Sequence, residues 1–200
     1  SFDADNRRVP PSGHRFPPPP VFAPDLITRE VLAEVDASFP GHPGSLDDFA
    51  WPVTRTDALA ALADFVAHRL PEFGPYEDAL VDGERVLAHS LLSVPLNLGL
   101  LTAAEACASV LTAAGRADVP LASVEGFVRQ LLGWREFLHH VYRREMPDLR
   151  AANVLGHEAS LPAFYWTGET RMRCVGEAVR QVVATGHTHH IQRLMVLGSF

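Results

Sequence analysis

The sequence predicts an all-α fold. Apolar residues recur at helical spacing in several stretches, capping and helix-breaking residues stand at the ends of those stretches, and no segment alternates long enough to form a strand. With 47% apolar residues, a chain of 200 residues can bury one substantial core. No apolar run reaches the roughly 18 to 20 residues of a membrane span, and no leader peptide is recognisable. We therefore expect no membrane partner.

The first fifty residues have the composition of a connecting segment. They contain prolines at positions 10–11 and 17–20 and a turn-forming run at 41–44. One short helix is predicted around Thr28–Val35. We expect residues 1–50 to wrap the surface of a helical part that spans residues 51–200.

Two helices are predicted next. The first begins near Thr56 and is expected to end at Pro71. In the second, Thr102 and Glu105 form a capping box that opens a helix to about Ala114. The apolar stripe of the first helix consists of Leu59, Leu62, Val66 and Leu70.

The longest periodic run follows. Ser123 is expected to cap it, and Pro147 is expected to end it. Its predicted buried stripe consists of Phe127, Leu131, Trp134, Leu138 and Val141 or Tyr142. After an irregular stretch, Thr170–Ala184 predicts a further helix, which Gly186 separates from a last one.

Charge and cysteine content narrow the function. A net charge of -7 argues against indiscriminate nucleic-acid binding, but residues 124–200 hold 9 arginines against 7 acids and could face phosphates. All 17 basic residues are arginine, which we attribute to genome composition rather than to a DNA-reading surface. Cys107 and Cys174 make no disulfide framework, and this predicts a reducing, cytoplasmic compartment.

The run from Gly186 to Val196 is the richest in chemistry. If it begins a helix, His187, His190 and Arg193 share one face, where the imidazoles can exchange a proton and the guanidinium can stabilise an anion. His189 and His190 would point about 100° apart, so at most one is expected in any given site and the other is packed. A zinc site on His187 and His190 lacks a third ligand at useful spacing.

Several motifs together resemble one known family. The matching segments are Ser1–Arg7, Phe73–Ala79, His89–Ser93 with Leu96–Gly99, Gly133–Phe137, and His189–Val196 preceded by Cys174. In order and spacing they resemble the iron-sulfur bacterial branch of the cryptochrome/photolyase family, which includes bacterial (6-4) photolyases. The resemblance implies a helical FAD-binding domain that is incomplete at both ends, with a missing α/β antenna domain before residues 1–50 and the first part of the flavin domain in residues 51–200.

The resemblance also implies residues for the cofactor. Without the resemblance, the side chains of Ser90, Ser93 and Asn97 indicate either helix caps or an anion site near a helix start. The resemblance implies that they hold the diphosphate of FAD. Trp134 is expected in the core. The sequence departs from its nearest relatives in that family at His139–His140, where an Arg-Gly pair would be expected. The implied cofactor-binding set is Tyr76, His89, Ser90, Leu91, Leu92, Ser93, Asn97, Arg135, Glu136 and Arg193.

Two further residues acquire roles from the resemblance. Cys174 would otherwise be a small buried residue, but the family implies that it is one of four thiolates of a [4Fe-4S] cluster, with the other three outside this chain. Trp166 is either a core aromatic or part of the electron path to the flavin. Both interpretations of Trp166 predict burial.

The implied function is light-driven repair of pyrimidine lesions in DNA by a monomeric FAD enzyme, with an antenna chromophore in the missing domain. His190 would protonate the lesion, His189 would support it, and Arg193 would pair with an acid outside this chain. The (6-4) photoproduct is favoured because its repair moves a proton between the bases. A cryptochrome-type photoreceptor without repair activity is the alternative, and a fragment without cofactor is a third.

Overall fold

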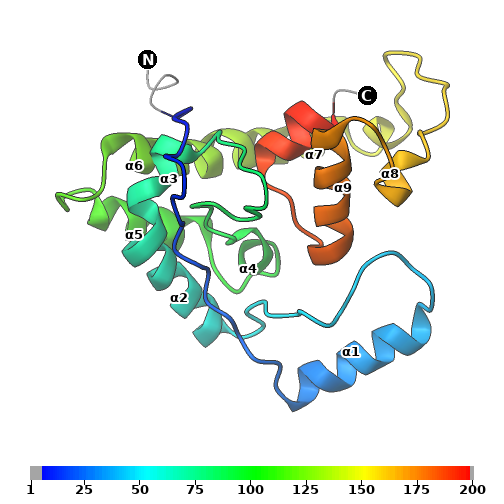
Figure 1. The fold of residues 1–200 in the computed structure, drawn as a ribbon. Helices are drawn as coiled ribbons and strands as arrows, with labels where there is room; N and C mark the ends of the chain where they lie inside the picture. Colours follow the sequence, from blue (N-terminus) through cyan, green and yellow to red (C-terminus); the bar gives the residue numbers. More distant parts are fainter. Residues whose placement is uncertain (1–5, 199–200) are drawn as a thin grey trace.

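The computed structural model describes residues 6–198, which form helices and loops without a strand (Figure 1). The all-α prediction is confirmed. The first five residues of the N-terminal motif, Ser1–Arg7, and the last two residues of the chain lie outside the described part. The α-helices are α1 (Leu26–Ser38), α2 (Arg55–Asp64), α3 (Leu70–Tyr76), α4 (Ser93–Asn97), α5 (Ala103–Ala113), α6 (Leu121–Val128), α7 (Glu136–Glu145), α8 (Phe164–Thr167) and α9 (Arg173–Thr185).

Shorter helical turns join or follow several of these helices. They are π-helical at Phe65–Arg69, Arg129–Arg135 and Gln192–Leu197, and 3₁₀-helical at Asp148–Ala151. A π-helical turn holds one residue more than an α-turn, so it changes which face of the following helix meets the core.

The segment before α2 holds one helix, as predicted. Helix α1 begins after Asp25, whose side chain accepts from the Thr28 amide, and none of its residues is buried. It lies apart from the other helices, and the preceding chain runs across α2 and α3 (Figure 1). Phe16 packs edge-on against Tyr76 of α3, with ring centroids 5.4 Å apart.

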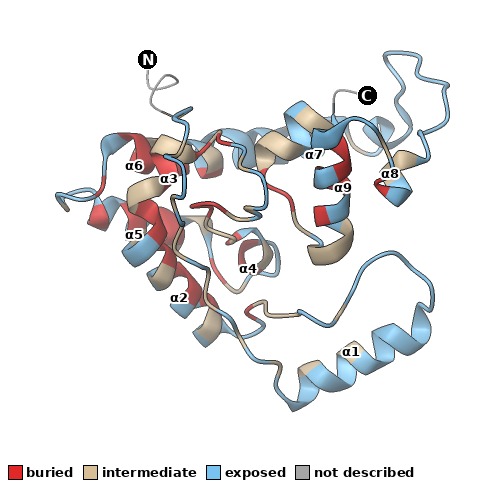
Figure 2. Cartoon of the chain, viewed as in Figure 1, coloured by how far each residue is buried: buried red, intermediate tan, exposed pale blue. Residues whose placement is uncertain are grey.

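The core lies between α2, α3, α5 and α6 (Figure 2). Phe65, Phe73 and Phe127 form its centre, with ring centroids 5.2 to 6.1 Å apart. The capping box of α5 is present as predicted, with Thr102 and Glu105 each binding the other's backbone amide. These contacts fix the helices that carry the loops described below.

The predicted end at Pro71 is wrong. The chain passes from α2 through a π-helical turn into α3, and Pro71 stands in the first turn of α3, where no helical hydrogen bond needs its missing N–H. Leu59, predicted in the buried stripe, is 43% exposed.

The predicted cap at Ser123 is also wrong. Helix α6 begins at Leu121, after Pro120, and Ser123 is fully buried. The Ser123 hydroxyl instead accepts from the Gly74 amide at 2.8 Å. This bond joins α6 to α3 at a point where a Cβ atom on Gly74 would overlap the backbone of Ser123.

The stripe predicted for the longest run is buried only in its first half. Phe127 and Leu131 are buried, whereas Trp134, Leu138 and Tyr142 are each more than half exposed, and α7 has no buried residue. The π-helical turn Arg129–Arg135 interrupts the 3.6-residue period on which the prediction rested. Helix α7 does end at Glu145, just before Pro147, as predicted.

The end of α9 agrees with the sequence, but the start of the last helical segment does not. Gly186 follows α9 in the left-handed conformation, with φ of 65°. The next helical residue is His190, so His187 and His189 stand in the connecting loop rather than on a helix.

Replacing Gly74 by Ala should lower the free energy of unfolding by about 1–3 kcal/mol, because the added methyl group forces α3 and α6 apart. Urea denaturation measures this. Gly115→Ala is the control, since a Cβ atom there meets nothing within 4 Å. Equal effects of the two substitutions would contradict the close approach.

Candidate functional site

A cavity of about 500 Å³ lies between the loop before α4, the helical run α6 to α7, and the segment after α9. Segments about a hundred residues apart in the sequence therefore share one space. Its lining residues are Phe73, His89, Ser90, Leu91, Leu92, Ser93, Leu96, Asn97, Phe127, Gln130, Leu131, Trp134, Arg135, Leu138, His187, His189, His190 and Arg193.

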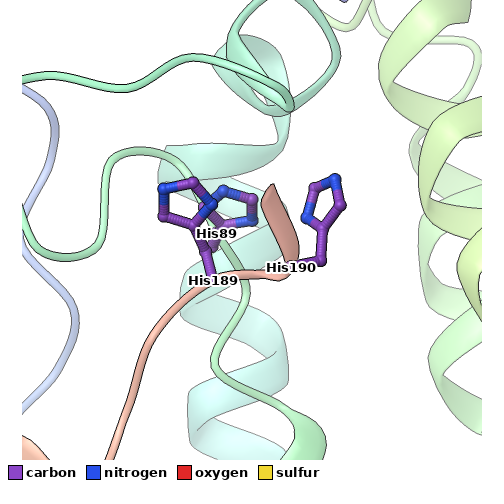
Figure 3. A group of neighbouring side chains, drawn as sticks. All are labelled: His89, His189 and His190. Carbon is purple, nitrogen blue, oxygen red and sulfur yellow. The ribbon is translucent and has the colours of Figure 1, made fainter. Parts of the chain in front are cut away.

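Three imidazoles gather at this cavity (Figure 3). The rings of His89 and His189 are stacked, with centroids 4.8 Å apart and an interplanar angle of 15°. The ring of His190 meets His89 edge-on at 5.5 Å. Both His189 and His190 line this cavity, and His189 is also buried. The helical angle of about 100° between neighbours does not apply here, because His189 precedes the helical turn.

Side-chain hydrogen bonds hold the His189 segment against α9. Gln192 Oε1 accepts from the His189 amide at 3.2 Å, and Gln192 Nε2 donates to Gln181 Oε1 at 3.0 Å. Gln181 Nε2 in turn donates to the Arg85 carbonyl at 3.0 Å. This chain of amides joins the histidine segment to the loop that carries His89.

The His89 loop is held from the other side by a buried arginine. Arg69 is 0% exposed; its Nη1 donates to the His89 carbonyl at 2.7 Å, and its Nη2 contacts Asp64 at 3.1 Å. Desolvation lowers the pKa of Arg69, while Asp64 opposes that shift. The arginine thus fixes the backbone at His89 with its charge paired.

His190 has an acidic partner that the sequence did not reveal. Its Nε2 lies 3.0 Å from Asp78 Oδ1, and Asp78 Oδ2 lies 3.5 Å from Arg7 Nε. Asp78 belongs to the Phe73–Ala79 motif but is 112 residues from His190. No spacing rule links such distant positions; only the fold does.

Burial keeps the other imidazoles neutral near pH 7. Desolvation, with Arg193 second, lowers the pKa of His187 to about 4. Desolvation is the largest cause that lowers the pKa of His189 to about 4, and the charge of His190 is the second. Desolvation, followed by the charge of His189, lowers the pKa of His89 well below its usual value. Nε2 of His89 and Nδ1 of His189 have no hydrogen-bond partner among residues 6–198.

These imidazoles are also the residues that could hold a metal ion. One ligand atom from each of His89, His189 and His190 lies within 4.8 Å of the others. This group differs from the one weighed in the sequence, because it leaves out His187 and adds His189 and, from a distant loop, His89. The nearly parallel rings of His89 and His189 do not direct their lone pairs to one point, however, so a metal would require one ring to turn.

The proposed diphosphate segment borders the same cavity. Ser90 is half-buried, Ser93 and Asn97 are exposed, and Leu92 is buried in the core. Arg135 Nη1 donates to Asn97 Oδ1 at 3.2 Å. The segment thus offers hydroxyl, amide and guanidinium groups along one wall of the cavity.

Some predicted site residues lie elsewhere. Glu136 is outside the cavity lining and lies 3.7 Å from His139, and Tyr76 packs against His14 and Phe16. The expected burial of Trp166 is wrong, because it is 65% exposed on α8.

Cys174 is exposed on α9, so its interpretation as a small buried residue is wrong. Cys107, by contrast, is buried.

Glu77 is a buried acid beside this site that the sequence did not single out. It is 3% exposed; Gln130 Nε2 donates to its Oε1 at 2.6 Å and Asn6 Nδ2 to its Oε2 at 3.0 Å. Desolvation raises its pKa to about 7, against the hydrogen bond from Gln130. Acids are rarely buried, so a buried glutamate is informative, but nothing in the sequence distinguished Glu77 from the half-buried Asp78 beside it.

Comparison with known proteins agrees with the motifs. Residues 1–51 match the family described as deoxyribodipyrimidine photo-lyase-related protein. A (6-4) photolyase of Agrobacterium fabrum is 42% identical over all 200 residues. The chain belongs to the photolyase-related protein family. This confirms the resemblance found in the sequence.

The chain is also similar to a viral protein. An uncharacterised protein of Acanthamoeba polyphaga mimivirus is 31% identical over 112 residues, which are 56% of this chain and 85% of that protein. The photolyase-related chain spans 39% of the length of the Agrobacterium photolyase. None of its helices within residues 6–198 is both long and apolar enough to cross a membrane.

Replacing Glu77 by Gln should change how stability depends on pH. Because folding raises the pKa of Glu77 from 4.5 to about 7, the stability linked to its proton is fully present below 4.5 and is lost as the pH rises through about 7. The variant lacks this loss, so relative to wild type it should gain at least about 1 kcal/mol between pH 5 and pH 8.

Urea denaturation at both pH values measures the effect of Glu77→Gln. Glu125→Gln is the control, because it removes a neighbouring negative charge from a half-buried residue. A difference between Glu77→Gln and wild type that does not vary with pH would contradict the raised pKa.

Proposed function

We propose that the chain is part of a light-driven, FAD-dependent enzyme that repairs (6-4) photoproducts in DNA. The observation that carries the proposal is the cavity in which His190, paired with Asp78, faces two neutral imidazoles and Arg193. The name of the Agrobacterium relative supports the same reaction. A photoreceptor without repair activity remains the alternative function, and the repair assay below separates the two.

The cavity suits a flavin nucleotide. It combines apolar walls from Leu91 and Leu96 with hydroxyl and amide groups at Ser90 and Asn97, and its volume of about 500 Å³ is in the range of small-molecule sites. We propose that Ser90, Ser93 and Asn97 hold the diphosphate. When bound, FAD supplies the photoexcited electron.

Arg135 and Arg193 are proposed to face anionic parts of the cofactor. Both line the cavity, and Arg135 is already oriented by its hydrogen bond to Asn97. Arginine keeps its charge at any relevant pH and offers several donors in a plane. Tyr76 and Glu136, whose side chains point elsewhere, would act on the cofactor only through neighbouring residues.

The contact with Asp78 determines which atom of His190 can move a proton. An ionised carboxylate only accepts hydrogen bonds, so Nε2 of His190 carries hydrogen toward Asp78. In the imidazolium form Nδ1 carries the second hydrogen and is the atom that can give a proton to the lesion, which leaves a neutral ring bonded to Asp78. One ring nitrogen of His190 faces the other two imidazoles (Figure 3). His189, stacked on His89, supports the position of this ring.

We further propose a [4Fe-4S] cluster that includes Cys174. Its thiol is exposed at the start of α9, where it can bind a cluster together with thiolates from elsewhere in a longer protein. The other three thiolates and any antenna chromophore would lie outside this chain. Trp166, exposed on the neighbouring helix α8, is proposed to carry electrons toward the flavin.

We also propose where the enzyme is located and how it assembles. Two free cysteines fit a reducing compartment, so we propose a cytoplasmic enzyme. Damaged DNA is its proposed partner, and we propose that it acts as a monomer.

Replacing His190 by Ala should lower the repair rate of a (6-4) lesion by roughly 10²- to 10⁴-fold, because general acid catalysis is lost. FAD content and photoreduction should remain. His140→Ala, an exposed histidine outside the cavity, is the control and should repair at the wild-type rate. Wild-type repair by His190→Ala under identical light would remove the proposed role. No repair by the wild type would favour a photoreceptor.

Replacing Cys174 by Ser in the full-length protein should remove the iron and the broad visible absorption of the cluster, because one thiolate ligand is lost. Iron analysis and absorption spectra measure this. Cys107→Ser, at the buried cysteine, should keep the iron. Full iron content in Cys174→Ser would show that the cluster does not use this residue.

A further inference from the structure

Glu77 is a buried acid that the proposed reaction does not use. Each of its carboxyl oxygens accepts from a different amide, Oε1 from Gln130 and Oε2 from Asn6. Gly126 leaves room for this arrangement, because a Cβ atom there would collide with Oε2. Asn6 Oδ1 is buried without a partner in the described range 6–198, which is consistent with its amide being turned toward the carboxyl group.

The ionised form of Glu77 determines how Gln130 is oriented. A carboxylate offers no donor, so Gln130 must turn its NH₂ group toward it. Turning the amide over would press its carbonyl oxygen against a carboxylate oxygen. Oε1 is therefore the atom that Gln130 offers to other groups, and among residues 6–198 it has no hydrogen-bond partner and is not enclosed.

Gln130 stands where two cavities meet. It lines the cavity of the histidines and a second, open cavity of about 930 Å³, and Trp134 and His190 line both as well. Trp134 follows four residues later and is 56% exposed. An exposed aromatic ring beside a fixed acceptor suits a pyrimidine, which packs one face on the ring and presents one edge to the acceptor.

We propose that Glu77 is a positioning residue that makes the site selective for thymine-type bases over cytosine-type bases. The N3–H of a thymine-type ring donates to Gln130 Oε1, whereas the N3 atom of a cytosine-type ring is an acceptor and faces Oε1 without a hydrogen between them. Glu77 touches no base and acts only through Gln130. The inference rests on the proposed function, since it requires a pyrimidine in this cavity.

The test is dark binding of lesion DNA to the full-length, FAD-loaded protein, measured by fluorescence anisotropy near pH 8, where Glu77, with a pKa of about 7, is mostly ionised. Two duplexes carry a (6-4) lesion whose 5′ base is thymine or 5-methylcytosine. Wild type should bind the thymine lesion about 10-fold or more tightly, the effect of one unpaired buried acceptor.

In Glu77→Gln the preference should fall to about threefold or less, because an amide at this position can donate as well as accept and lets Gln130 turn over. Glu77→Met, which offers no strong hydrogen-bonding group, should do the same. Glu125→Gln removes a nearby charge that pairs with Arg129, and it should keep the wild-type ratio. If Glu77 has a purely structural role, its replacement would weaken the binding of both duplexes equally and leave the ratio of the two affinities unchanged.

Equal binding of the two lesions by wild type, or an unchanged ratio in the Glu77 variants, would overturn the inference. In either case a preference for lesion over undamaged DNA leaves the proposed function standing. If wild type shows no preference for lesion DNA at all, the proposed function fails and the inference fails with it.

Discussion

The site depends on one buried charge. Arg69 comes from the turn between α2 and α3, carries no exposed surface, and bonds both to Asp64 beside it and to the carbonyl of His89 twenty residues later. Removing one partner of such a pair leaves an uncompensated buried charge, which typically costs 3–5 kcal/mol. The arginine therefore binds the His89 loop firmly to the helical core, and the position of His89 determines where His189 can stack.

Burial lowers the pKa of the histidines on one side of the cavity and raises the pKa of Glu77 on the other. On the histidine side it removes charge, because His89, His187 and His189 are poorer bases than in water. On the other side it makes Glu77 a weaker acid. Both shifts favour neutral groups, so the charged side chains that line the cavity are the guanidinium groups of Arg135 and Arg193.

The sequence predicted what local rules control. The capping box at Thr102, the helix before Gly186 and the end of α7 before Pro147 all follow from interactions within a few residues. It failed where distant segments compete: Ser123 bonds to Gly74 instead of capping its own helix, and Pro71 lies within a helix because a π-helical turn precedes it. The histidine run was recognised as a site, but its partners were not.

The π-helical turn Arg129–Arg135 links the errors in the fold to the chemistry of the site. An uninterrupted α-helix would carry the stripe of Phe127 and Leu131 on through Trp134 and bury it. Trp134 lies inside this turn, whose extra residue breaks the 3.6-residue period, and it is exposed beside Gln130 while Phe127 stays in the core. Such turns are frequent at functional sites because they turn a core-facing helix toward a cavity without ending it. The same π-helical turn thus explains why the predicted burial of Trp134 is wrong and why Gln130, Trp134 and Arg135 line the cavity.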